Sequence, residues 1–124
     1  MFQWLITASL LFAGVVAAAE THATIPKQFR GSWAGSTAHC AAASAESKLT
    51  IRETALDFYE SRGRVLAVAT QGETELALLI EASGEGQSWL DARQFRLSED
   101  GQTLTDVTGG RKQAVRVRCN GGVK

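Results

Sequence analysis

The sequence predicts an all-β protein, a single antiparallel meander β-barrel of about eight strands closed by one disulfide. Three observations lead to this prediction. Short stretches alternate apolar and polar residues with a period of two, which is the pattern of strands with one buried face. Turns that contain glycine separate these stretches about every ten residues or a little more. The two cysteines, Cys40 and Cys119, stand near the two ends of the patterned region.

The N-terminal segment is predicted to be a secretory signal peptide, residues 1–19. It is apolar, carries no charged side chain and ends in Ala17-Ala18-Ala19, and small residues before the junction are typical of cleavage sites. The alternative is a retained anchor, since the run is about long enough to cross a bilayer. Its Ala, Gly, Ser and Thr content, and the lack of a basic cluster after it, favour cleavage. We expect a periplasmic or secreted protein with no stable membrane anchor.

The mature chain divides into an extended lead-in, residues 20–28, and a β-barrel domain, residues 29–124. The lead-in holds the only proline, Pro26, and the first strand is expected within residues 29–36. The clearest hairpin turn is Asp100-Gly101, because this pair tolerates the positive φ that tight turns require. The alternation predicts these inward-facing residues: Leu49 and Ile51; Leu56 and Phe58; Leu66 and Val68; Leu76, Leu78 and Ile80; Phe95 and Leu97; Val115, Val117 and Cys119.

One stretch breaks the alternation, because the parity that buries Phe95 also buries Asp91 and Arg93. A β-bulge between Ala92 and Phe95 would turn both charges outward. The alternative is a buried Asp91–Arg93 pair at a binding site. The bulge is the favoured interpretation, because buried charges are costly unless well paired. Separately, residues 38–48 are expected to form either a short helical turn or a long loop.

The cysteines are predicted to form a structural disulfide between Cys40 and Cys119. Export favours such a bond, and in a closed meander the first and last strands are neighbours. The bridge would stabilise the fold by roughly 4–5 kcal/mol at most in the chain-entropy model. The alternative, a redox-active pair, lacks a C-x-x-C motif.

The stretch Gly31-Ser32-Trp33 on the expected first strand resembles the Gly-x-Trp signature of the lipocalin-like, or calycin, barrels. The resemblance implies that Trp33 packs at the closed end of the barrel with a basic residue laid across it, here Arg116 or Arg118. Alternation puts both arginines on the face opposite the valines of their strand, so they are expected to reach Trp33 only at the barrel mouth or from outside. Ordinary core packing is the alternative role for Trp33. The chain is much shorter than full-length lipocalins and shows no C-terminal helix.

The charge balance excludes several classes of protein. Thirteen basic and thirteen acidic residues give a formal net charge of zero, which indicates neither a nucleic-acid partner nor a polybasic membrane patch. The chain has only two histidines and two cysteines, so no metal is expected. With no phosphate-binding glycine loop before a helix, no cofactor is expected either. A nucleophile–base pair can be named only at Ser36 and His39, where a plain loop histidine is the favoured alternative.

The sequence supports two main hypotheses of function. The first is an exported, non-catalytic binding module that holds a small apolar ligand in its interior or at its open end. The alternative is an envelope protein-interaction module such as a lysozyme-type hydrolase inhibitor, a class that this chain resembles in architecture only. Its candidate interaction residues are Trp89, at the end of a glycine-rich loop, and Arg62 and Arg64. Trp89 could instead be a strand-edge aromatic residue. An uncharacterised hydrolase is a third possibility.

Overall fold

A computed structural model describes residues 18–42 and 45–119 of the chain. The predicted signal peptide therefore lies outside the described residues except for Ala18 and Ala19. The elements follow one another as β1 (Glu20–His22), η1 (Lys27–Phe29), β2 (Gly31–Ala34), α1 (Thr37–Ala41), β3 (Leu49–Ile51), β4 (Ala55–Asp57), β5 (Arg62–Gln71), β6 (Glu75–Gly84), β7 (Gln87–Leu97), β8 (Thr103–Asp106), η2 (Thr108–Gly110) and β9 (Ala114–Arg118).

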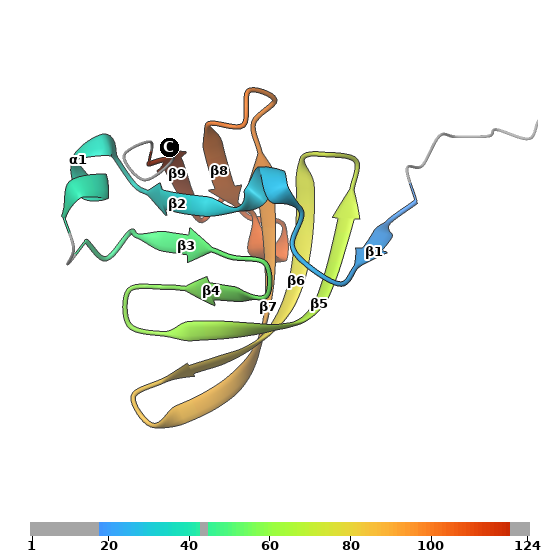
Figure 1. The fold of residues 1–124 in the computed structure, drawn as a ribbon, viewed down its shortest axis with the longest axis horizontal. Helices are drawn as coiled ribbons and strands as arrows, with labels where there is room; N and C mark the ends of the chain where they lie inside the picture. The colour runs from blue at the N-terminus through green and yellow to red at the C-terminus, as the bar shows by residue number, and fades with distance from the viewer. Residues whose placement is uncertain (1–17, 43–44, 120–124) are drawn as a thin grey trace, which may run out of the picture.

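Strands β2 to β9 form a closed antiparallel barrel in which each strand pairs with the next along the chain (Figure 1). The first and last of them, β2 and β9, also pair with each other and close the ring. The predicted all-β fold of eight meandering strands is thus confirmed. Strand β1 is an addition within the predicted lead-in: it pairs with the second half of β5, whereas β4 pairs with the first half.

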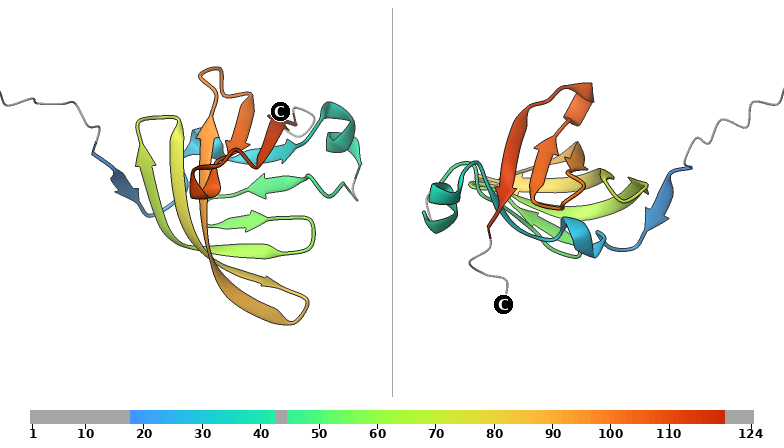
Figure 2. Two further views of the ribbon diagram at one scale, coloured as in Figure 1. Left: turned by 180° about the vertical axis from the view of Figure 1, so that it is seen from behind. Right: turned by 90° about the horizontal axis from the view of Figure 1, so that it is seen from above.

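The barrel interior is packed with apolar side chains from all the barrel strands except β9, together with Ile25 and Phe29 from the segment before β2. These two residues belong to the chain that carries η1, which lies across one end of the barrel (Figure 2). Most residues predicted to face inward are buried: Leu49, Ile51, Leu56, Val68, Leu76, Leu78, Ile80, Phe95, Leu97 and Cys119. The alternation therefore identified most of the core correctly.

A β-bulge is present, but on a different strand from the predicted one. The pairing of β6 with β7 runs without interruption past Asp91 and Arg93, so the predicted bulge between Ala92 and Phe95 is wrong and both charges face inward. The register shift occurs in β5 between Val65 and Ala67. The extra residue reverses the parity of the strand, so Leu66, predicted to be inward, is 42% exposed.

The face predicted for β9 is also wrong. Val115 is 40% exposed, whereas Arg116 pairs directly with Leu104, a fully buried residue, and so faces the interior. An arginine can occupy such a position when the fold supplies partners for its guanidinium, and β9 carries two arginines with partners of this kind.

The predicted disulfide is present. Cys40 and Cys119 are bonded, with 5.5 Å between their Cα atoms, and tie α1 to the end of β9. The helical turn expected within residues 38–48 corresponds to α1, which the Ser36 side chain caps; Ala43 and Ser44 lie outside the described residues. Among the described residues, no helix has both the length and the apolar character needed to cross a membrane.

Candidate functional site

Trp33 lies fully buried beneath the guanidinium of Arg118. The Arg118 Cζ atom is 4.2 Å from the centroid of the Trp33 ring, and the indole nitrogen donates a hydrogen bond to the Phe29 carbonyl at 3.1 Å. The two residues are direct partners across the β2–β9 pair. The contact therefore forms on the inward face of β9, so the prediction that Arg116 and Arg118 lie on the outward face is wrong.

Arg118 also links β9 to two other segments, the one that carries η1 and the β7–β8 turn. Its guanidinium nitrogens donate to the carbonyls of Gln28 and Arg30 at 2.7 Å each and to that of Gly101 at 3.0 Å. Burial lowers the pKa of Arg118, although an arginine remains charged near neutral pH. A Cβ atom at Gly31 would lie 2.9 Å from Arg118 Nη1, and the φ of Gly31 is +129°. Glycine before Trp33 therefore makes room for the arginine that covers it.

A second charged cluster lies inside the barrel around Arg93. Its guanidinium bonds Asp91 at 2.8 Å and Asp106 at 2.9 Å, and its Cζ lies 5.0 Å from the centroid of the Phe58 ring. Burial lowers the pKa of Arg93, but hydrogen bonds and charge attraction from the two carboxylates together raise that pKa above its ordinary value. Buried Asp106 accepts two further hydrogen bonds from Thr108, so this cluster is closely paired.

Arg116 is less well satisfied than Arg118. Its Nε donates to the Ser47 carbonyl at 2.8 Å, but its Nη1 is buried without a hydrogen-bond partner. Burial lowers the pKa of Arg116; the charge of Asp106 opposes this shift and that of Arg93 adds to it. Arg118 rather than Arg116 is thus the residue over Trp33.

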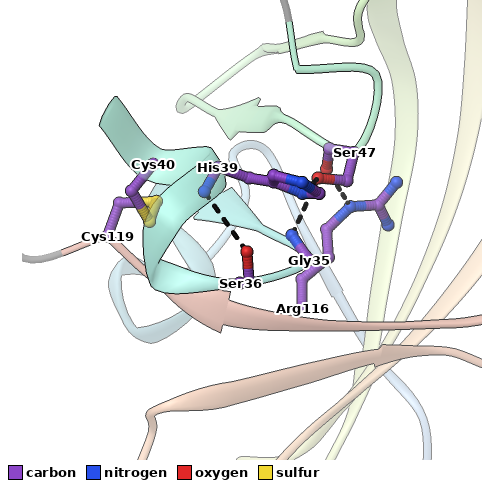
Figure 3. Close-up of a disulfide and its surroundings, with 7 residues drawn as sticks. All are labelled: Gly35, Ser36, His39, Cys40, Ser47, Arg116 and Cys119. Carbon is purple, nitrogen blue, oxygen red and sulfur yellow. Dashed lines mark hydrogen bonds between the residues drawn. A yellow bond between two sulfur atoms is a disulfide. The ribbon is translucent and has the colours of Figure 1, made fainter. Parts of the chain in front are cut away.

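The Ser36–His39 pair, which the sequence analysis named but did not favour, does not form through the imidazole ring. The Ser36 hydroxyl accepts a hydrogen bond from the His39 backbone N–H, as a helix cap, whereas the ring Nδ1 lies 2.9 Å from the Ser47 hydroxyl (Figure 3). Ser47 also accepts from the Gly35 N–H and, through its carbonyl, from Arg116. Ser47 thus connects α1, the end of β2 and β9 beside the disulfide.

The three candidate interaction residues do not form one surface. Trp89 is 43% exposed and belongs to the inward face of β7 near the β6–β7 hairpin, because its partner across the strands is buried Ala82. Arg62 and Arg64 are exposed and pair with Asp57 and Glu81. Trp89 instead borders a cavity of about 260 Å³ between the β4–β5 turn and the hairpin.

Two adjoining cavities form a groove on the outer wall of the barrel, which we call the outer groove. Their volumes are about 490 and 600 Å³, and both are lined by Ala69, Ala77 and Gln94. In the left view of Figure 2, β5, β6 and β7 lie side by side between β1 and the loop that carries η2. The lining residues place the groove on this part of the wall, with Thr21 on one side and Thr108 to Gly110 on the other.

The floor of the outer groove is apolar although it faces away from the core. It consists of four alanines and one leucine at outward positions of β5, β6 and β7: Ala67, Ala69, Ala77, Leu79 and Ala92. Polar groups stand at its rim, where Arg96 bonds Glu75 at 2.7 Å beside Lys112. An apolar floor with a few polar groups around it is the usual composition of a ligand site. The sequence prediction missed this site, because outward alanines on separate strands give no local signal.

Two further results bear on function. Within residues 18–42 and 45–119, no three histidine, cysteine or acidic side chains are grouped so that they could hold a metal ion. Comparison of the chain with protein-family models, with curated proteins and with solved structures found no match. The function is therefore inferred from the geometry of this chain.

Proposed function

We propose that the protein is a non-catalytic binding module that holds a small, mainly apolar ligand in the outer groove. The observation that carries the proposal is the apolar floor of this groove, on a wall where an antiparallel barrel ordinarily presents polar side chains to water. Each of the two adjoining cavities is within the usual range of ligand sites, about 300–1,000 Å³.

Packing inside the barrel supports the choice of the outer wall. Trp33, Phe95, Ile80 and Leu104 are fully buried, and the cluster around Arg93 occupies further interior space. A small barrel filled in this way serves as a rigid scaffold. Its outer face can then carry the binding site.

The proposal is tested with the neutral apolar fluorophore N-phenyl-1-naphthylamine. We expect saturable, blue-shifted fluorescence with the mature wild-type protein. An Ala77→Glu variant should lose this signal, because residue 77 lines both cavities. Ser83→Glu is the matched control: it places the same charge on the same face of β6, beyond the groove. Absence of saturable binding, or equal binding by both variants, would contradict the proposal. Native mass spectrometry of protein purified from the cell envelope would identify a natural ligand.

A second candidate function is inhibition of a lysozyme-type hydrolase through the β6–β7 hairpin. This hairpin projects beyond the neighbouring strands (Figure 1). Partly exposed Trp89 lies near its turn, two pairs from the Gly84–Gln87 pair that ends the ladder. Aromatic residues of this kind often dominate protein interfaces. The test is a lysozyme assay with micromolar protein and with Trp89→Ala. Unchanged lysozyme activity with wild-type protein would remove this candidate.

We also propose that the protein is exported, to the periplasm or beyond. The disulfide is compatible with an oxidising compartment, and the alanines before Glu20 match a cleavage site. Intact-mass analysis of protein recovered from the envelope or medium should give a chain that begins at Glu20. A chain that retains residues 1–19 would contradict cleavage.

A further inference from the structure

We infer that a second copy of this chain docks on the outer wall and completes the outer groove, an inference that rests on the proposed function. The first observation is a set of exposed leucines beside the groove. Leu66, Leu79 and Leu90 are 42%, 39% and 67% exposed and come from three adjacent strands, β5, β6 and β7. We call them the leucine ridge.

The ridge and the groove floor are continuous. Leu79 pairs with Ala67 on one side and with Ala92 on the other, and all three residues line the groove. Leu90 lies two residues before Ala92, on the same face of β7. An apolar surface that crosses three strands in this way is typical of an interaction site.

In a single copy of the chain, the outer groove is open to solvent on the side away from the barrel. Ala67, Leu79 and Ala92 are exposed, so this part of the floor is open to solvent, whereas Ala69 and Ala77 are half-buried. A bound ligand would keep much of its apolar surface in water, whereas ligand sites usually enclose about 70–90% of the ligand. A covering surface from outside the chain would supply the missing side, and an apolar one would match the ridge.

The charges around this surface favour a second copy as the occupant. Arg64 pairs with Glu81 at 3.3 Å on one side of the apolar floor, and Arg96 pairs with Glu75 at 2.7 Å on the other. Each side is neutral, and the whole chain has no formal net charge, so two copies do not repel each other. A two-fold axis across β6 would bring each arginine near a glutamate of the other copy, as self-complementary interfaces require.

The experiment measures the mass of the mature chain by sedimentation velocity over a range of concentrations. We expect a dimer for wild type, dimerisation weakened at least tenfold by Leu90→Glu, and an unchanged dimer for Val115→Glu. Val115 is the matched control, because it is an exposed apolar residue on the outer face of β9, away from the ridge. We also expect Leu90→Glu to weaken N-phenyl-1-naphthylamine binding at least tenfold, although Leu90 does not line the groove.

The outcomes separate this inference from the proposed function. A monomeric wild type overturns the inference, whether or not the fluorophore binds. Equal disruption by the Leu90 and Val115 variants overturns the placement of the interface, and unchanged fluorophore binding by monomeric Leu90→Glu overturns completion of the groove by the second copy. A monomer that sediments with phosphatidylethanolamine–phosphatidylglycerol vesicles, and loses this with Leu90→Glu, overturns the inference in favour of a lipid surface. Dimerisation without fluorophore binding supports the interface and contradicts only the proposed ligand.

Discussion

Arg116 and Arg118 occupy the same face of β9, yet their replacement by methionine should have very different effects on stability. Arg118 makes three hydrogen bonds to carbonyls and stacks on Trp33, whereas Arg116 makes one hydrogen bond and leaves Nη1 without a partner. Methionine keeps much of the side-chain volume in both variants. The comparison therefore isolates what each guanidinium contributes.

The contacts of each arginine determine how much its replacement should lower the free energy of unfolding. Hydrogen bonds from a charged donor contribute about 1.5–3 kcal/mol each, and a cation–π contact about 0.5–2 kcal/mol. These contributions overlap and Arg118 is only half-buried, so the loss is smaller than their sum. We expect Arg118→Met to lower the free energy of unfolding by about 3–4 kcal/mol. Arg116→Met should lower it by less than about 1 kcal/mol, because relief from the buried, unpaired guanidinium offsets the lost bond to Ser47.

Urea unfolding, followed by the fluorescence of the buried tryptophan, measures both variants against wild type. The tryptophan signal should change in a single transition if the small domain unfolds cooperatively. Near-equal losses for the two variants, or a larger loss for Arg116→Met, would refute the reasoning, since burial alone and not pairing would then determine the contribution of these arginines.

Three further predictions concern the disulfide, the glycine that begins β2 and the β7–β8 turn. Replacing Cys40 and Cys119 together by alanine should lower the free energy of unfolding by up to about 4–5 kcal/mol, since the bridge spans 79 positions; a midpoint equal to that of the oxidised wild type would contradict this. Gly31→Ala should cost about 1–3 kcal/mol in the same assay, because φ is +129° there; an unchanged midpoint would argue against the close approach. Hydrogen bonds from Ser98 and then from a backbone N–H lower the pKa of Asp100, so Ser98→Ala should raise that pKa toward its ordinary value in an NMR titration, and a constant value would show that the serine has no part in it.

The fold could be predicted because the alternation of apolar and polar residues reports directly which face of a strand is buried. The prediction from alternation was wrong where something other than the local pattern determined which face of the barrel a side chain occupies. At Leu66 a single extra residue reverses the parity of β5, and such an insertion is invisible when the residues on both sides are also apolar. Predicting the disulfide required only the positions of the two cysteines and the fact that the first and last strands of a closed meander are neighbours.

The charged positions were harder to predict for a physical reason. Arg93, Arg116 and Arg118 face inward because distant segments supply their partners, such as Asp106 on β8 and the carbonyls beside η1. These partners lie 13 or more positions away in the sequence, so a short sequence window does not contain both members of such a contact. The Asp91–Arg93 pair is the exception, and the sequence indicated it as the alternative to a bulge. The rule that charges face water therefore assigned the wrong face to β9. The outer groove could not be predicted either, since its floor combines alanines from three strands and its sides come from β1 and η2.

The short strand β1 has a consequence for how the mature chain must begin. It starts at Glu20, directly after the proposed cleavage point. It is attached to β5 by three residue pairs, with Val68, Ala69 and Thr70, and by a side-chain hydrogen bond between His22 Nε2 and Thr70 Oγ1 at 2.7 Å. A protease that trimmed a few residues too many would leave a bare backbone rim while the barrel itself stayed folded. An exposed strand edge of this kind pairs with strands of other molecules. Heterogeneous processing of the N-terminus should therefore cause aggregation of otherwise natively folded protein.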